Sequence, residues 1–139
     1  MEAANYVANT HLDAGRYQAV VEVADRFLAP GEWRDRLQRG QLLGGERHLL
    51  LAKTRALHAL GDTAGLQRTA SQANQMAAAG VPMRPEQHMI RGLHFDRLGD
   101  LEAAARHLKA LCDALAPLGL PSEGPDLLLE AMRMRIDVA

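Results

Sequence analysis

The chain has 139 residues, of which 47% are hydrophobic and 24% charged, and its formal net charge at pH 7 is −1. This size and composition favour one folded domain and exclude a disordered chain or two domains of ordinary size. A net charge this close to zero argues against a surface built to bind nucleic acid, which needs clustered positive charge.

The balance of residue types predicts an all-α fold. Alanine and leucine dominate, whereas valine, isoleucine and threonine, which favour strands, together number only 12. The single cysteine, Cys112, excludes an intrachain disulfide, and its leucine neighbours predict a buried, unreactive thiol. No apolar stretch reaches the roughly 20 residues of a membrane span, and the first residues lack a basic signal-peptide pattern, so we expect a cytoplasmic protein.

The first pair of predicted helices covers residues 3–14 and 17–28, with Gly15 between them. The second of these helices has apolar residues at helical spacing, which favours a helix with one buried face. Pro30 and Gly31 follow it, and we expect these two residues to end it.

Residues 30–45 form an insertion between the first helix pair and the next. Trp33 and Leu37 lie four residues apart with charged residues between them, which predicts a short amphipathic helix. We expect Trp33 to anchor this helix on the core, and Gly40 with the pair Gly44-Gly45 to break it.

Two further pairs of helices are predicted beyond the insertion, followed by one last helix. Their expected ranges are 46–60 with 63–79, 86–98 with 101–116, and finally 125–138. We expect the inner faces of the helix pairs to bury Phe27, Leu57, Leu60, Phe95, Leu98, Leu108 and Leu111.

Glycines mark the turns between the paired helices. Gly15, Gly61 and Gly99 can each adopt the left-handed conformation that closes a helix. Gly92, two helical turns before Gly99, has no side chain at the point where the partner helix must approach closely. Gly65 makes Thr63-Ala-Gly-Leu a poor helix start, because glycine costs about 1 kcal/mol relative to alanine inside a helix, and the second repeat is therefore the least regular.

This repeated arrangement resembles the tetratricopeptide repeat, whose helix pairs recur about every 34 residues. The resemblance is carried by residues at matching distances from the turn glycines: Ala8, Thr54 and Gly92 before the turn, then Val20, Leu66 and Ala104, and then Phe27, Ala73 and Leu111 after it. It implies an α–α superhelix of about three helical hairpins in a single domain of residues 1–139. The implied repeats are about 3–29, 46–79 and 86–117, with the insertion 30–45 and a C-terminal helix at about 125–138.

A second likeness is short and lies near the end of the chain. The stretch Leu118-Gly-Leu-Pro-Ser-Glu123, followed by a helix with Leu127 and Arg133, is similar to the close of the bacterial transcriptional activator domain. That domain is itself built of tetratricopeptide-like hairpins and occurs in larger bacterial regulators. The likeness implies a regulatory or oligomerisation domain from a larger bacterial transcription regulator or multidomain enzyme.

The sequence offers no recognisable catalytic or metal-binding motif. The six histidines include no His-Glu-x-x-His motif and no pair four residues apart. Neither serine lies in Gly-x-Ser-x-Gly, and no phosphate-binding loop is present. We therefore expect no enzymatic activity, no cofactor and no metal site.

The resemblance to tetratricopeptide repeats implies a binding face instead. Stacked hairpins of this kind curve so that their first helices line a concave groove. Asparagines there suit the backbone of an extended peptide, an arginine suits a carboxylate, and apolar residues form a floor. Among the positions carried over from the family, the proposed groove residues are Asn5, Asn9, His48, Leu51, Arg55, His58, Met89, Leu93 and Arg97. The acidic residues carried over with them, Glu2, Asp13, Glu86 and Asp96, argue against the carboxylate-clamp pattern of chaperone-binding relatives.

The predicted C-terminal helix carries two apolar stripes, and one of them includes Leu128, Met132 and Ile136. One stripe can pack on the preceding helix, whereas the other needs a second partner. We expect that stripe to contact either a second copy of the chain or a further domain, unless the helix buries both stripes within one chain.

Three hypotheses about function follow. The first is an interaction module that binds a protein or peptide segment in the groove, with no direct binding of nucleic acid or membranes. The second is the regulatory or oligomerisation domain implied by the bacterial likeness. The third is a secretion-type chaperone, which also uses three such repeats.

Overall fold

The computed structural model describes residues 2–115 of the chain. Within this range it contains seven α-helices and no strand, so the predicted all-α fold is confirmed. The helices are α1 (Glu2–Asp13), α2 (Tyr17–Phe27), α3 (Pro30–Gln38), α4 (Gly44–Leu60), α5 (Thr63–Ala78), α6 (Arg84–Leu98) and α7 (Leu101–Leu115). The expected helix over residues 125–138, with its stripe of Leu128, Met132 and Ile136, lies outside the described residues.

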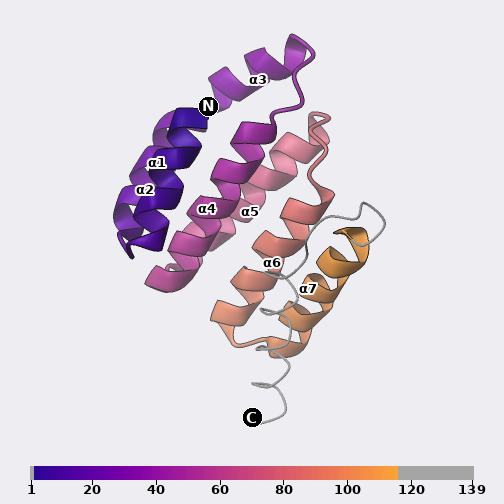
Figure 1. Ribbon diagram of the computed structural model, residues 1–139. Helices are drawn as coiled ribbons and strands as arrows, with labels where there is room; N and C mark the ends of the chain where they lie inside the picture. Colours follow the sequence, from indigo (N-terminus) through magenta and orange to yellow (C-terminus); the bar gives the residue numbers. More distant parts are fainter. Residues whose placement is uncertain (1, 116–139) are drawn as a thin grey trace.

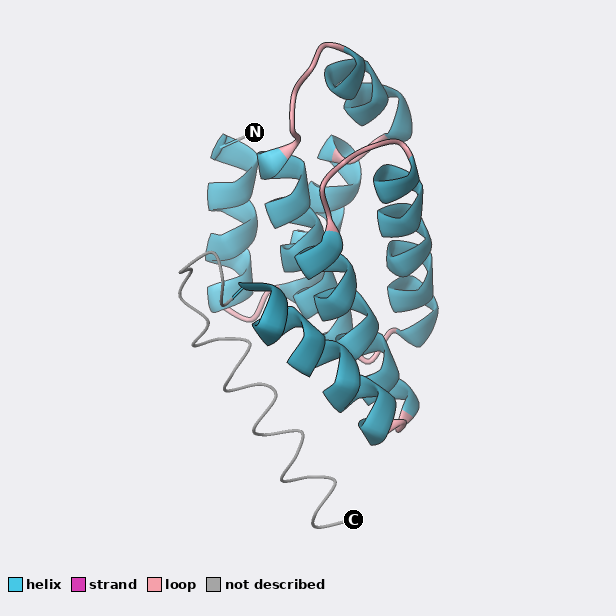
Figure 2. Ribbon diagram, turned by 90° about the vertical axis from the view of Figure 1, so that its right-hand side faces the viewer, coloured by secondary structure: helices cyan, strands magenta, loops and turns pink. Residues whose placement is uncertain are grey.

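The helices form three antiparallel hairpins, α1–α2, α4–α5 and α6–α7, and α3 lies across one end of the bundle (Figure 1). Helix α4 packs against both helices of the first hairpin, and α6 packs against both helices of the second. The view turned by 90° shows the same arrangement, with α3 and its connecting loop at the top (Figure 2). None of these helices has the length and hydropathy needed to cross a membrane.

The expected short helix in the insertion is present as α3, and Trp33 is fully buried in the core, as predicted. The expected breaks around this helix were partly wrong. Pro30 occupies the first turn of α3, where its missing N–H costs nothing, and does not simply end α2. Gly44 and Gly45 begin α4, because the chain turns earlier, at Gly40 and Leu43.

The predicted turns and close approaches agree with the structure. Gly15, Gly61 and Gly99 all have positive φ angles, between 71° and 83°. At Gly92 an added Cβ would lie only 2.8 Å from Cγ of Leu108, so α6 and α7 approach each other closely there, as expected.

The core has two connected parts. The larger part joins the first two hairpins and α3, and the smaller one joins α6 to α7 around Leu93 and Leu108. Leu51 of α4 packs against both parts and so links them. Cys112 is half-buried against the smaller part, so its thiol is less enclosed than expected.

The predicted core was correct for three of the seven residues, since Leu57, Leu108 and Leu111 are buried. Phe95 is only half-buried. Leu60 and Leu98, however, are 46% and 57% exposed. Each is the last residue of its helix, directly before a turn glycine, where the chain leaves the contact between the paired helices.

Phe27 was also expected in the core but is 36% exposed. The buried positions of α2 follow steps of four residues, Val20, Ala24 and Leu28, so that Leu28 takes the place expected for Phe27. Gln72 of α5 fixes this end of α2, because its Nε2 donates a hydrogen bond of 3.0 Å to the carbonyl oxygen of Leu28.

Candidate functional site

A small polar pocket of about 120 Å³ lies between α1 and α4. Its lining combines Asn9 from α1 with residues of α4 that are three or four positions apart and therefore share one face of that helix. The described lining residues are Asn9, His48, Leu51, Ala52 and Arg55. Four of these five are residues that the sequence assigned to a binding face.

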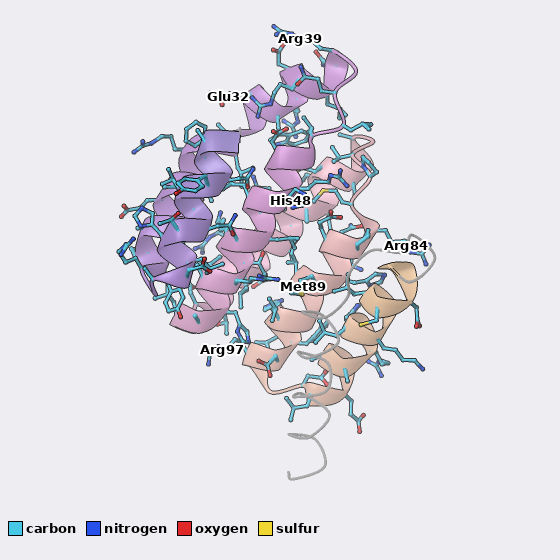
Figure 3. All side chains as sticks on the ribbon, viewed as in Figure 1. Glu32, Arg39, His48, Arg84, Met89 and Arg97 are labelled. Carbon is cyan, nitrogen blue, oxygen red and sulfur yellow. The ribbon has the colours of Figure 1, made fainter. Side chains whose placement is uncertain are left out.

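Arg55 is the main charged group of this pocket. Its side chain is exposed and forms no hydrogen bond or ion pair with any described residue. His48 is also exposed, and Figure 3 shows it on the face of α4 that is turned toward the viewer. A guanidinium group has five N–H donors in a planar fork, so Arg55 can bind a carboxylate with two parallel hydrogen bonds.

The two asparagines of α1 differ in how far the chain already uses them. Asn5 donates from Nδ2 to the carbonyl oxygen of Gly45 at 3.0 Å, which ties α1 to the first turn of α4. Asn9 is exposed and donates one hydrogen bond of 2.9 Å to the carbonyl oxygen of Asn5. An amide has two N–H donors and one oxygen acceptor, so Asn9 keeps hydrogen-bonding capacity for a ligand.

Two other predicted groove residues, His58 and Arg97, join α4 to α6. Nε2 of His58 lies 2.5 Å from Oδ2 of Asp96, whose side chain is buried. Arg97 donates to the carbonyl oxygens of His58 and Ala59 and so satisfies the last turn of α4. Figure 3 shows Arg97 near the lower end of the molecule, away from His48.

Met89 and Leu93, which were expected to form an apolar floor, are only 5% and 2% exposed. They pack in the smaller core with Ala104, Leu108 and Leu111 of α7. Met89 and Leu93 therefore pack α6 against α7 and do not line the pocket. The apolar surface of the pocket comes from Leu51 and Ala52.

A wider depression of about 360 Å³ runs along α5. Its described lining residues all come from that one helix, and they are Gln67, Arg68, Ser71, Gln72 and Gln75. Gln72 already holds the end of α2 through Leu28. We therefore take the α1–α4 pocket, which is lined by residues of two helices, as the candidate site.

Sequence reasoning missed several contacts between helices. Arg47 of α4 donates from Nη1 to the carbonyl oxygen of Pro82 at 2.8 Å and lies 3.5 Å from the carboxylate of Glu86. His88 and His107 meet across α6 and α7. For the two histidines, the only available signal in the sequence was their similar distance from Gly99. An antiparallel hairpin brings together residues on either side of its turn.

Comparison with known proteins found no similarity to report: no family model matches the chain, and neither do any curated protein or solved structure.

Proposed function

We propose that this protein is an interaction module of the tetratricopeptide-like kind, which binds a protein or peptide segment across α1 and α4. The observation that carries the proposal is Arg55, an exposed arginine without a partner among the described residues, set in a pocket beside His48 and Asn9. An unpaired arginine in a concave polar setting is typical of a site that recognises carboxylates.

The packing of the hairpins supports this proposal. In stacked helical repeats each new hairpin packs on the one before, and the first helices form a continuous face. Helices α1, α4 and α6 are neighbours of this kind, since α4 contacts α1 and α6 contacts α4. A module of this type would act in the cytoplasm, where its partners are other proteins.

The proposed binding face is narrower than the one expected from the sequence. Glu86 of α6 is paired with Arg47, which offsets its charge toward an acidic ligand, and the carboxylate of Asp96 is buried against His58. The ligand that fits best is a segment with a carboxylate for Arg55, an aspartate or glutamate side chain or a chain terminus. Asn9 and His48 then supply hydrogen bonds to its backbone, and Leu51 packs against an apolar neighbour.

The test begins with capture of partners from a cell lysate and identification of the segment that binds. We expect Arg55→Ala to weaken binding of that segment by about tenfold to a hundredfold, which corresponds to about 1.4–2.8 kcal/mol. The melting temperature should barely change, because Arg55 is exposed in the free protein. Affinity is measured by calorimetry and stability by thermal unfolding.

Arg26→Ala is the matched control. Arg26 of α2 is likewise exposed and unpaired among the described residues, but it lies outside the pocket. Its loss removes the same charge from the protein and should leave affinity within twofold of the unaltered protein. Equal effects of the two substitutions would indicate general attraction to the ligand, and the assignment of the pocket would then be wrong.

A second candidate function, a regulatory or oligomerisation domain, is favoured by the outer face of α1. Tyr6 is 76% exposed and Val7 41% exposed on this helix. Exposed large apolar side chains suit contact with another domain or chain. Sedimentation of the unaltered protein and of Tyr6→Ser separates the two functions. Only if the protein assembles through α1 should this substitution lower the mass of the sedimenting particle.

A further inference from the structure

Two histidines from different helices face each other on the last described hairpin. His88 lies on α6 and His107 on α7, and their Nδ1 atoms are 3.5 Å apart. The ring centroids are 5.7 Å apart, and the ring planes are inclined by 35°. A separation of 3.5 Å is longer than the usual hydrogen-bond range of about 2.7–3.2 Å, so a direct bond between the rings contributes little.

The same separation matches the spacing of two ligands on one metal ion. A zinc ion binds imidazole nitrogens at about 2.0–2.1 Å in tetrahedral geometry. Two such nitrogens are then about 3.3–3.4 Å apart, from the tetrahedral angle and that bond length. A shift of a few tenths of an ångström brings His88 and His107 to this spacing.

The surroundings hold the ring of His107 in place and lower the pKa of both histidines. The ring of His107 stacks on Phe95 at a centroid distance of 5.4 Å and an interplanar angle of 3°. Burial, and then the charges of Arg84 and Arg91, lower the pKa of His88. Burial also lowers the pKa of His107, with smaller effects from His88, Arg91 and Arg106. Neutral imidazole is the form that binds metal ions.

We propose that His88 and His107 together bind one divalent transition-metal ion, such as Zn²⁺, through their Nδ1 atoms, and that the ion joins α6 to α7. Imidazole ligands suit zinc, copper and nickel, whereas magnesium and calcium prefer oxygen. No group of three or more histidine, cysteine, aspartate or glutamate side chains in residues 2–115 is placed to hold a metal ion. The proposed ion therefore has two ligands from the described chain and open positions for water or an outside ligand.

The experiment titrates zinc chloride into the full-length protein after removal of metal by a chelator. Calorimetry measures affinity, and NMR follows the six histidine rings. We expect the largest shifts at His88 and His107 and a rise in the melting temperature, because zinc binds only the folded hairpin. His88→Gln or His107→Gln should each weaken binding at least tenfold, and the double variant should be little worse than either one.

His94→Gln is the matched control, because His94 lies on α6 beside Phe95 but outside the pair. It should keep its zinc affinity within twofold. Arg91→Gln should bind zinc more tightly than the unaltered protein, since it removes a positive charge near both rings. Magnesium chloride should cause no shift at either histidine.

Three results would overturn the proposal: no zinc binding by the unaltered protein, NMR shifts centred on other histidines, or equal loss in His94→Gln and His88→Gln. The NMR result on the unaltered protein decides the matter even if a variant folds poorly. None of these readouts involves a protein partner or Arg55. The zinc site and the proposed function are therefore tested independently.

Discussion

Arg55 and Arg97 show that one residue type on one predicted face can serve different purposes. Both were expected to meet a ligand. Arg97 lies beside the C-terminal end of α4 and donates to the carbonyl oxygens of His58 and Ala59. Arg55 stands midway along the same helix, where the carbonyls are already used by the helix itself, and it remains unpaired among the described residues. The role of each arginine therefore depends on whether backbone carbonyls without a hydrogen-bond partner lie within its reach.

At Gly92, the addition of a single methyl group should lower the stability of the protein substantially. In Gly92→Ala the new Cβ would lie 2.8–2.9 Å from Cγ and Cδ2 of Leu108, which is fully buried and has little room to move. We expect the free energy of unfolding to fall by about 1–3 kcal/mol, as is usual for overpacking in a core. Denaturant unfolding of the two proteins measures this difference.

Gly31→Ala is the control, because a Cβ at Gly31 meets nothing within 4 Å and Gly31 lies within the helix α3. It should be neutral or stabilise by up to about 1 kcal/mol through helix propensity. A double variant, Gly92→Ala with Leu108→Ala, should cost less than the sum of its single substitutions, because the two sites share one space. Additive costs would show that Gly92 and Leu108 do not crowd each other.

At the scale of a helix, α5 begins with residues of low helix propensity, and a side-chain cap stabilises its first turn. Gly65 lowers helix propensity, and the sequence marked this repeat as irregular for that reason. The structure adds the cap: the side chain of Asp62 accepts a hydrogen bond of 2.9 Å from the backbone N–H of Gly65. A Cβ at Gly65 would lie 2.6 Å from the Asp62 carboxylate and 2.9 Å from Leu57, so glycine leaves the room that the cap needs.

Loss of this cap should therefore destabilise the protein measurably. We expect Asp62→Ala to lower the free energy of unfolding by about 1 kcal/mol, because one N–H group of the first turn loses its acceptor. Asp62→Asn should remain within a few tenths of a kcal/mol of the unaltered protein, since asparagine caps about equally well. Thermal and denaturant unfolding measure both variants, and equal losses in the two would mean that the charge, and not the cap, matters.

At the scale of the whole molecule, polar contacts hold the last hairpin to the middle one at both ends of α6. Near its start, Glu86 lies 3.5 Å from Arg47 of α4. Near its end, Asp96 contacts His58, and Arg97 covers the last carbonyls of α4. Between them, Leu51 packs against both parts of the core. These contacts therefore couple the unfolding of the last hairpin to that of the middle one.

His58→Ala tests this coupling, because it leaves the buried Asp96 carboxylate without its histidine partner. We expect the free energy of unfolding to fall by about 1–3 kcal/mol, the usual cost when a buried acceptor loses a donor. Hydrogen exchange should show faster opening of α6 and α7 than of α1 and α2, because the lost contact lies at the boundary between the last two hairpins.

His11→Ala provides the comparison, since His11 accepts a hydrogen bond from Arg16 within the first hairpin and joins no two hairpins. Its effect should stay below about 0.5 kcal/mol, as for most surface substitutions, and should not reach α6. Uniform loss of protection over all helices in His58→Ala would argue against a local role at this boundary.

The sequence by itself determined the helices and their turns, because these depend on neighbours along the chain. Apolar spacing, together with Gly15, Gly61 and Gly99, predicted three hairpins, and the described helices match the predicted ranges within a few residues. The buried anchor Trp33 and the close approach at Gly92 were also predicted correctly, because a large apolar ring on an amphipathic helix favours burial and a glycine leaves room for the partner helix.

Only the tertiary structure decided which side chains of a shared face remain open. A helical face fixes direction but not what the neighbouring helix places opposite it. Met89 and Leu93 became core because α7 covers them, and Leu28, four residues after the buried Ala24, took the core position expected for Phe27. The pocket around Arg55 and the meeting of His88 with His107 both depend on packing between different helices, and periodicity along one helix carries no information about such contacts.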